Sequence, residues 1–547
     1  MQIFEAIVEH YLKELSFSSG MDWSSLFSQA GYSPIASTSP SSLSSVSSIT
    51  SPRLNRRTIQ QHRRGSPSTD TKQPNFKLTK EHSTHFWIKY EQFQSEMKWV
   101  YPDNVLDIAS VQQLSKHDDK LSSILQFLHQ NCIKSQQWSM ATSVINYSLF
   151  LLQQELKCHC LEVSELFTFS KFESVGSAAD GTLIGCADRF DVLVVFELSK
   201  CGEFLALHSN LTPEIPAGQV ILGTRDADVT STNKSYLKKT VVENIIADFI
   251  LPNEFEDHIE ILIKKIILKL NSSYRNKFDK LPFSFQMSPS KKLTISFDTR
   301  LMQGFGVDIA EISLRLIPAI SLSCTENSLL PPVYAVPSWG DHIKLGLNGN
   351  TQAKSMLGRI FRDDILDHLF WNLSTEKLKS GIVASFENRL QLSGVRSCHR
   401  LCQMTLKALF SQGNKNKLLN KGEVDAHIIS HVVSFLLQES PPSAWTSDNL
   451  SDRVSDAIHF LRSSYQNIWL PNFAIHNPHL VAKMPCLENM AALLSGKQQN
   501  LLAHVSEDAA LKVLDYIELR LQETGLAKCV KNEFSSQMWE YEFFMFG

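Results

Sequence analysis

The chain has 547 residues and a formal net charge of −3, with 43% hydrophobic and 20% charged residues. This length allows two to four domains, and the composition is that of a soluble globular protein. The small net charge excludes a global basic field that would hold the chain on nucleic acid. No apolar run reaches the roughly 18 to 20 residues that span a bilayer.

The start of the chain and its cysteines predict a cytoplasmic location. Glu5 stands where a secretory leader would carry a basic region. The ten cysteines are scattered through the chain, which favours reduced thiols in the cytosol. Any membrane association is expected to arise through a partner.

Two segments are expected before the main body, an amphipathic helix over residues 1–20 and a disordered Ser/Pro-rich linker over residues 21–79. Apolar side chains from Ile3 to Leu15 recur at helical spacing, so this helix either docks on the body or binds a partner. The stretch 33–73 has no aromatic residue and buries too little apolar surface to offset its ordering entropy. Four Ser-Pro pairs predict phosphorylation there, with an inert tail as the alternative, and they start at Ser33, Ser39, Ser51 and Ser66.

Residues 172–198 organise the rest of the chain. They predict a short strand, a turn at Gly176 and Ser177, a glycine-bounded connection, and a second strand. The second strand carries an unbroken apolar run from Val192 to Phe196, which is typical of a central strand covered on both faces.

Helices and strands are predicted on either side of this centre. Residues 80–160 carry helical apolar stripes, and the pattern is helical again from about residue 350. Between them the sequence predicts helices over 236–249 and 258–270 and strands over 292–297 and 312–322. The lysines of the second helix are interpreted as a solvated face, with a weak anion site as the alternative.

The Gly176-Ser177 turn followed by Phe190-Asp191-Val192 resembles the nucleotidyltransferase core of the Mab-twenty-one-like family, a distant relative of cyclic GMP-AMP synthase. The strand predicted over 312–322, which contains Leu316-Ile317-Pro318, and the Cys398-His399 block resemble the inositol trisphosphate receptor-interacting protein subfamily. Further blocks follow in the family's order at 370–390, 427–430 and 445–473. The resemblance covers roughly residues 110–520.

This resemblance implies an α+β fold of two lobes, a nucleotidyltransferase-like mixed sheet with helices and a helical C-terminal lobe. The helical lead-in and sheet lobe are expected over 80–335, with a long helix near 135–157 entering the first strand. The helical Mab-twenty-one-like lobe is expected over 336–520. An aromatic tail over 521–547 is expected to pack on its own body, with a docking peptide as the alternative.

In active relatives the Gly-Ser backbone holds triphosphate and three acids hold metal ions. The resemblance carries the turn to Gly176 and Ser177, and the three acid positions to Arg189, Asp191 and Arg315. Two of the three are arginines, so we expect a degenerate site, a pseudoenzyme without catalytic residues, metal or cofactor. One escape is a β-bulge that would re-aim Asp188 toward Asp191.

The function that follows is a protein-interaction scaffold or regulator. The subfamily's name implies a calcium channel or receptor as partner, and nucleic acid is not an expected partner. The subfamily often carries a membrane anchor, whereas no transmembrane segment is visible here. Two alternatives are an active nucleotidyltransferase of the cyclic GMP-AMP synthase-like class, which would need Mg²⁺, and a non-catalytic sensor of nucleotides or inositol phosphates.

The cysteine pattern favours buried thiols over a zinc site. Cys398 and Cys402 lie four residues apart with His399 beside them, but a zinc site needs about four ligands. The second cluster, Cys158-His159-Cys160, does not have the spacing of a zinc finger.

Overall fold

A computed structural model provides the structure. The residues it describes are 80–102, 125, 128, 133–163, 167–198, 203–208, 215, 217–225, 236–242, 245–275, 285–288, 291–298, 311–322, 333–337, 369–392, 397–415, 418–419, 423–475, 477, 480 and 498–524. The residues from Tyr90 onward belong to one compact unit. The predicted N-terminal helix, the linker with its Ser-Pro pairs, and the aromatic tail beyond Thr524 lie outside the described residues.

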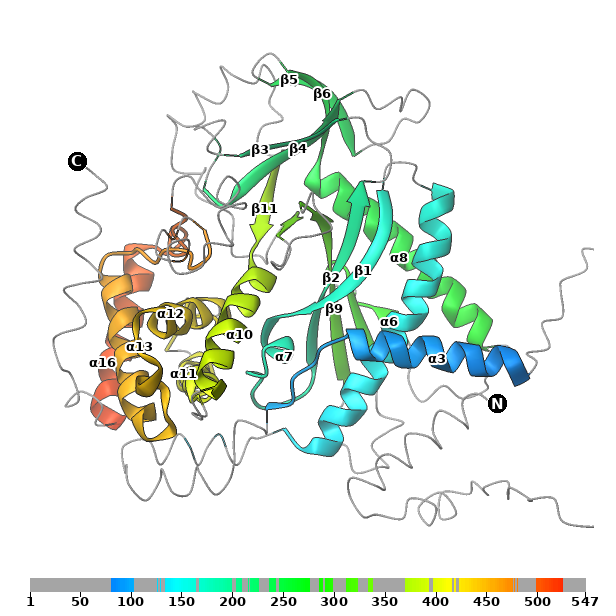
Figure 1. The fold of residues 1–547 in the computed structure, drawn as a ribbon. Coiled ribbons are helices and arrows are strands. Elements are labelled where there is room, and N and C mark those ends of the chain that lie inside the picture. Colours follow the sequence, from blue (N-terminus) through cyan, green and yellow to red (C-terminus); the bar gives the residue numbers. More distant parts are fainter. Residues whose placement is uncertain are drawn as a thin grey trace, which may run out of the picture. The chain divides into compact units, whose positions relative to one another are not determined.

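One mixed sheet runs through the described part of the chain and combines with helices into an α+β fold, as predicted (Figure 1). The strands are β1 Phe167–Val175, β2 Arg189–Leu198, β3 Glu203–His208, β4 Gln219–Arg225, β5 Leu237–Val242, β6 Ile245–Ile250, β7 Phe285–Met287, β8 Thr294–Asp298, β9 Glu311–Ser321, β10 Tyr334–Val336 and β11 Phe370–Ser374. Their order is β1-β2-β9-β10-β11-β4-β6-β5, with β3 on β4, β8 on β9 and β7 on β8. β2 and β9 pair in parallel, and the other pairs are antiparallel.

The central strand β2 is covered on both faces, as its apolar run predicts. Residues 192–196 are fully buried. One face carries Leu193 and Val195 into a cluster with residues of β1, β9 and β10. The other face carries Phe190 against Trp138 and Phe196 against Phe255, through ring contacts to two helices. β2 therefore lies in the core of the sheet.

The sheet divides at Pro318 in the middle of β9. One edge of β9 pairs with β2 over its length, whereas the other edge pairs first with β8, up to Arg315, and then with β10, from Ile320. The N–H groups of Leu316 and Leu322 donate to Leu293 and Val333 on this second side. Alternate residues of a strand point their N–H groups the same way, so Pro318, which has none, sits where neither neighbour could accept one.

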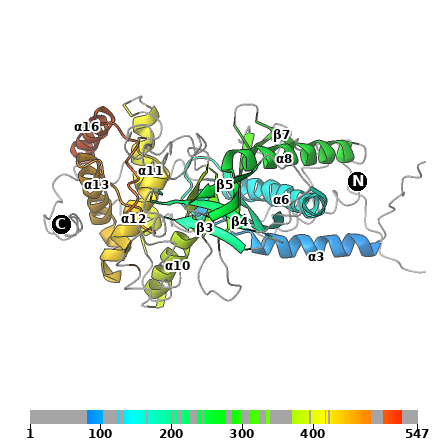
Figure 2. The ribbon, with the colours of Figure 1, turned by 90° about the horizontal axis from the view of Figure 1, so that it is seen from above.

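The helices form two groups around the sheet. They are α3 Lys80–Glu96, α6 Ser135–Val163, α7 Gly176–Ala179, α8 Pro252–Arg275, α10 Glu376–Leu392, α11 His399–Lys415, α12 Ala426–Glu439, α13 Leu450–Gln466 and α16 Glu507–Thr524, with 3₁₀ turns at Pro442–Trp445 and Ser447–Asn449. α6 contacts β1 and α8, while α11, α12 and α13 contact one another and α13 contacts α16 (Figure 2). We call α10 to α13 with α16 the helical lobe. None of the described helices is both long and apolar enough to cross a membrane.

α12 is the central helix of the helical lobe. Every residue from Ile428 to Gln438 is buried, which is the pattern of a helix surrounded by neighbours. Asp425 caps its N-terminus by accepting a hydrogen bond from the Ile428 N–H at 2.8 Å. Only Thr375 lies between the end of β11 at Ser374 and the start of α10 at Glu376, so the sheet passes into the helical lobe almost without a loop.

Several predicted elements are confirmed. The helix near 135–157 is α6, the helix over 258–270 lies within α8, and the strands over 292–297 and 312–322 correspond to β8 and β9. Lys264 and Lys269 of α8 pair with Glu260 and Glu155 at the protein surface. Cys398 and Cys402 are buried, as expected, and burial raises the pKa of the Cys398 thiol to about 12.

Two expectations about secondary structure are wrong. The helix predicted over 236–249 is the hairpin β5–β6, in which Val242 pairs with Ile245. β-Branched residues, of which this segment holds several, favour strands over helices. The helical pattern from residue 350 does not hold at β11 either, because Phe370 to Asn372 pair with β4. The sheet thus includes residues beyond the predicted lobe boundary at 335.

Candidate functional site

The turn between β1 and α7 brings the backbone against Asp191. Gly176 has φ +75°, and a Cβ atom at this position would lie 3.2 Å from Asp191 Oδ2. Val175, just before the turn, pairs directly with Asp191 across β1 and β2. The sequence needs glycine here for its left-handed conformation and for the close approach of the backbone to the carboxylate.

Arg315 and Arg189 flank Asp191. Arg315 is the direct neighbour of Asp191 on the parallel strand β9, and Arg189 lies two residues earlier on β2. Side chains alternate along a strand, so Arg189 and Asp191 leave the same face of the sheet. Burial raises the pKa of the Asp191 carboxyl, against the opposing attraction of Arg315 and then Arg189.

Asp188 remains outside this arrangement. Its backbone carbonyl accepts hydrogen bonds from the N–H and the hydroxyl of Ser313, at 2.7 and 2.9 Å. The pairing of β2 with β9 is continuous from Arg189 onward, and the register shift of β1 against β2 falls near Phe169 instead. A bulge that would re-aim Asp188 is therefore not formed.

Lys407 joins the helical lobe to the Gly-Ser turn. Its ammonium group donates to Ser177 Oγ at 2.9 Å, to Thr182 Oγ1 at 2.6 Å and to the Thr182 carbonyl at 3.1 Å. Burial lowers the pKa of Lys407 to about 7, although Asp180 acts to raise it. Sequence reasoning missed this residue, because it lies 230 positions from Ser177 and has no local motif to mark it.

Further charged side chains lie buried or half-buried beside the turn. Asp180 accepts a hydrogen bond from the Ser380 hydroxyl at 2.9 Å, and burial raises the pKa of its carboxyl. Glu376 and Lys379 form a buried ion pair at 3.0 Å. Although burial acts against the charged form, Lys379 and His427 hold the pKa of Glu376 well below its usual range. The charges of Glu376 and Lys379, at the start of α10, therefore act on Asp180, and that of Glu376 acts on Asp191 as well.

The donor set around Asp191 does not fit a pair of divalent cations. Two-metal transfer needs carboxylates that bridge and share the ions. Asp191 supplies one carboxylate, while the neighbouring positions hold guanidinium groups, which offer no lone pair to a metal. The site instead presents cations beside a glycine turn, an arrangement that suits an anionic group.

Of the predicted site residues, the structure brings together Gly176, Ser177, Asp191 and Arg315, with Arg189 exposed beside them. Asp188 contributes its backbone carbonyl to the sheet. Comparison with known proteins finds no family model that matches this chain and no curated protein that matches its sequence.

Proposed function

We propose that this protein has a nucleotidyltransferase-like fold with a degenerate catalytic site and acts as a protein-interaction scaffold or regulator. The observation that carries the proposal is Arg315 paired directly with Asp191 across β2 and β9. At about 4 Å and an effective dielectric near 20, a divalent ion and one arginine repel each other by roughly 8 kcal/mol. The one carboxylate, Asp191, offsets the repulsion from one arginine but not the repulsion from both Arg189 and Arg315.

The test of lost catalysis uses the purified full-length protein with ATP, GTP, Mg²⁺ and Mn²⁺, with and without nucleic acid or cell extract. Pyrophosphate release and new nucleotide products are measured, and neither is expected. Turnover that disappears in Asp191→Asn would contradict the proposal and establish the enzyme alternative. A double variant carrying Arg189→Asp and Arg315→Asp provides the matched comparison, since it places carboxylates at both positions.

A second candidate function is a non-catalytic sensor of a nucleotide or inositol phosphate. The specific observation that favours it is the approach of Lys407 to Ser177 beside the exposed Arg189. Calorimetric titration with ATP, GTP and an inositol polyphosphate, in the presence of a chelator, measures such binding. The sensor predicts metal-independent binding that Arg189→Ala and Arg315→Ala each weaken, whereas a scaffold alone predicts none.

The partner in the leading proposal is a protein, and a calcium channel or receptor is the class that the sequence resemblance names. Proximity labelling with the full-length chain in cells identifies it. A reproducible set of neighbours that is unchanged in Asp191→Asn supports a scaffold that works without the degenerate site. Neighbours that change with this substitution would instead tie partner binding to the site.

A further inference from the structure

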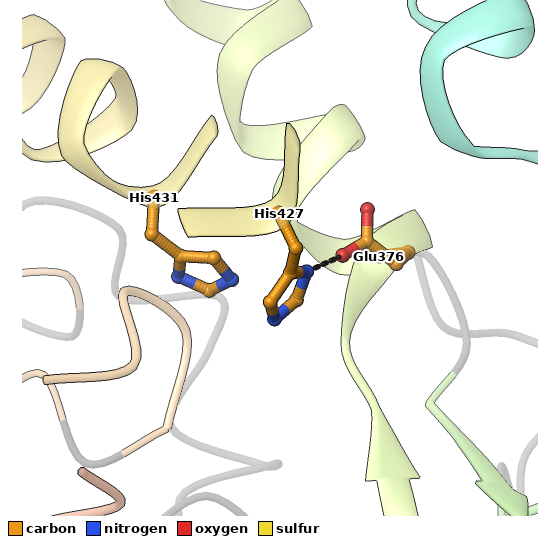
Figure 3. Close-up of side chains that lie close together, drawn as sticks. All are labelled: Glu376, His427 and His431. Carbon is orange, nitrogen blue, oxygen red and sulfur yellow. Dashed lines mark ion pairs between the residues drawn. The ribbon is translucent and has the colours of Figure 1, made fainter. Parts of the chain in front are cut away.

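Glu376, His427 and His431 converge between α10 and α12 (Figure 3). Glu376 begins α10, and the two histidines lie four residues apart in α12, so their rings leave the same helix face. His427 Nδ1 lies 2.9 Å from Glu376 Oε1, and the two imidazole ring centroids are 4.4 Å apart. One ligand-capable atom of each residue lies within 4.8 Å of those of the other two.

The buried ring of His431 gives an independent indication that this cluster binds a ligand. Its side chain is 0% exposed, and its Nδ1 accepts a hydrogen bond from the Phe473 N–H at 2.9 Å. Its Nε2 has no hydrogen-bond partner among the described residues, although the ring faces His427 (Figure 3). Because Nδ1 accepts from Phe473, this Nε2 carries the proton of the neutral ring; a water would satisfy it as it stands, and a metal ion would do so after the proton moves to Nδ1.

The donor types favour a transition-metal ion as the occupant. One carboxylate and two imidazoles form the set that holds zinc in sites with an open fourth position. Mg²⁺ and Ca²⁺ prefer oxygen ligands throughout, so a site with two nitrogens disfavours them. The Glu376 carboxylate also favours a cation over an anion, and an imidazole pair four apart on a helix is a common framework for zinc.

We propose that Glu376, His427 and His431 bind one zinc ion, or a related first-row divalent metal, with one coordination position left for water or a partner. Its three ligands differ from the residues of the degenerate centre, although Glu376 interacts electrostatically with Asp191, and the proposal does not depend on the function proposed above. The sequence signal is the His427-x-x-x-His431 spacing, to which the fold adds Glu376 from 51 positions earlier in the chain.

Binding requires rearrangements at both histidines. At His427, the proton on Nδ1, which lies 2.9 Å from Glu376 Oε1, must move to Nε2 if Nδ1 is to hold the metal. At His431 the proton must move in the opposite direction. While Nδ1 accepts from Phe473, the proton of the neutral ring sits on Nε2. When the metal takes the Nε2 lone pair, the proton moves to Nδ1, and the Phe473 N–H loses its acceptor. The amide signal of Phe473 in a ¹H–¹⁵N spectrum is therefore expected to shift when metal is added.

The positive charge of Lys379 opposes metal binding, so a variant without this charge is expected to bind the metal more tightly. Its ammonium lies 3.0 Å from Glu376 Oε2, where it repels a second cation on the same carboxylate. Lys379→Met removes this repulsion and leaves the carboxylate to the metal. We expect Lys379→Met to tighten metal binding by about tenfold, the low end of changes made around a first ligand shell.

The test strips the purified full-length protein with a chelator and titrates it with Co²⁺ and Zn²⁺. Visible bands of tetrahedral Co²⁺ and elemental analysis are expected to report one bound ion per chain. His427→Gln and His431→Gln are each expected to weaken binding by about tenfold or more. His459→Gln is the matched control, because His459 on α13 also has a buried Nε2 that finds no hydrogen-bond partner in the described part of the chain but is not part of the Glu376 cluster.

The titration of the unmodified protein decides the matter even if a variant fails to fold. Absence of cobalt bands and of bound zinc in the native chain would overturn the proposal. Equal metal affinity in the native protein and in a folded His427→Gln variant would overturn it as well. His427 is 30% exposed, so this variant is expected to fold, which circular dichroism checks.

Discussion

Gly176 is the residue on which the Gly-Ser turn depends. Its φ of +75° is costly for a residue with a Cβ atom, and an added Cβ would crowd Asp191 Oδ2. Gly176→Ala is expected to lower the free energy of unfolding by about 1–2 kcal/mol, measured by urea denaturation. Gly185 also has a positive φ, but no atom of the described residues lies within 4 Å of an added Cβ, so Gly185→Ala is the control for backbone strain alone. Equal losses in both variants would show that crowding against Asp191 contributes nothing.

Lys407 is expected to make stability depend on pH in the alkaline range. Its pKa is about 7 in the folded protein and 10.5 in an ordinary environment, so the unfolded chain holds more protons between these values. Stability therefore rises with pH from about 7 to 10.5, by up to about 1.4 kcal/mol per pH unit. Subtracting the unfolding free energies of Lys407→Met, measured over the same range, isolates this contribution. A difference that stays constant or falls with pH would contradict a neutral buried lysine.

The residues of the candidate site show how far sequence reasoning reaches. Asp191 and its arginines can be located because a strand's alternation and a family resemblance place them on neighbouring strands. Lys407 cannot be located in this way, and neither can the role of the Glu376–Lys379 pair, because Ser177 and Asp180 lie far away from them in the chain and only tertiary packing unites them. A buried lysine looks like any helical lysine in the sequence.

At the level of secondary structure, replacing Pro318 in β9 by a residue that favours strands is not expected to stabilise the protein. Valine there would place a buried N–H group toward the gap between β8 and β10, where no strand of the described residues pairs with it. Pro318→Val is expected to cost about 1–3 kcal/mol of unfolding free energy, measured by urea denaturation. Ile317→Val, which adds no donor, is the control and is expected to cost about 0.5–1.5 kcal/mol. A stabilised Pro318→Val variant would show that the gap accommodates the donor.

Strands with one strong signal are predicted well, whereas strands with mixed signals are not. The run from Val192 to Phe196 has no helical period and its length is that of a strand, so β2 can be located from the sequence. In the β5–β6 hairpin the apolar residues Leu237, Val241 and Ile245 recur every four positions, which imitates a helix. The pairing of Val242 with Ile245 that decides between the two is visible only in the folded chain.

For the whole molecule, the scaffold proposal predicts that the helical lobe carries the partner surface. Leu511 and Leu519 on α16 are 59% and 40% exposed, whereas the matched pair Ile261 and Leu268 on α8 is 53% and 70% exposed. Replacing both residues of α16 by Asp in the full-length chain is expected to reduce the neighbours found by proximity labelling. The same change on α8 is expected to have little effect.

Thermal melts of both double variants must first match the unmodified protein, so that lost capture reports on the surface alone. If the α8 variant loses the neighbours and the α16 variant retains them, the partner surface lies beside the sheet and the prediction is wrong.

The junction between β11 and α10 also has a mechanical consequence. Thr375 alone separates Ser374, whose strand lies inside the sheet, from Glu376, the first residue of the helix. Only the backbone dihedrals of this one residue could therefore act as a hinge there. Lys407 adds a second connection, from α11 to Ser177. We therefore expect a force applied to the helical lobe to be passed to β11 and its neighbours β4 and β10, rather than to be absorbed in a flexible linker.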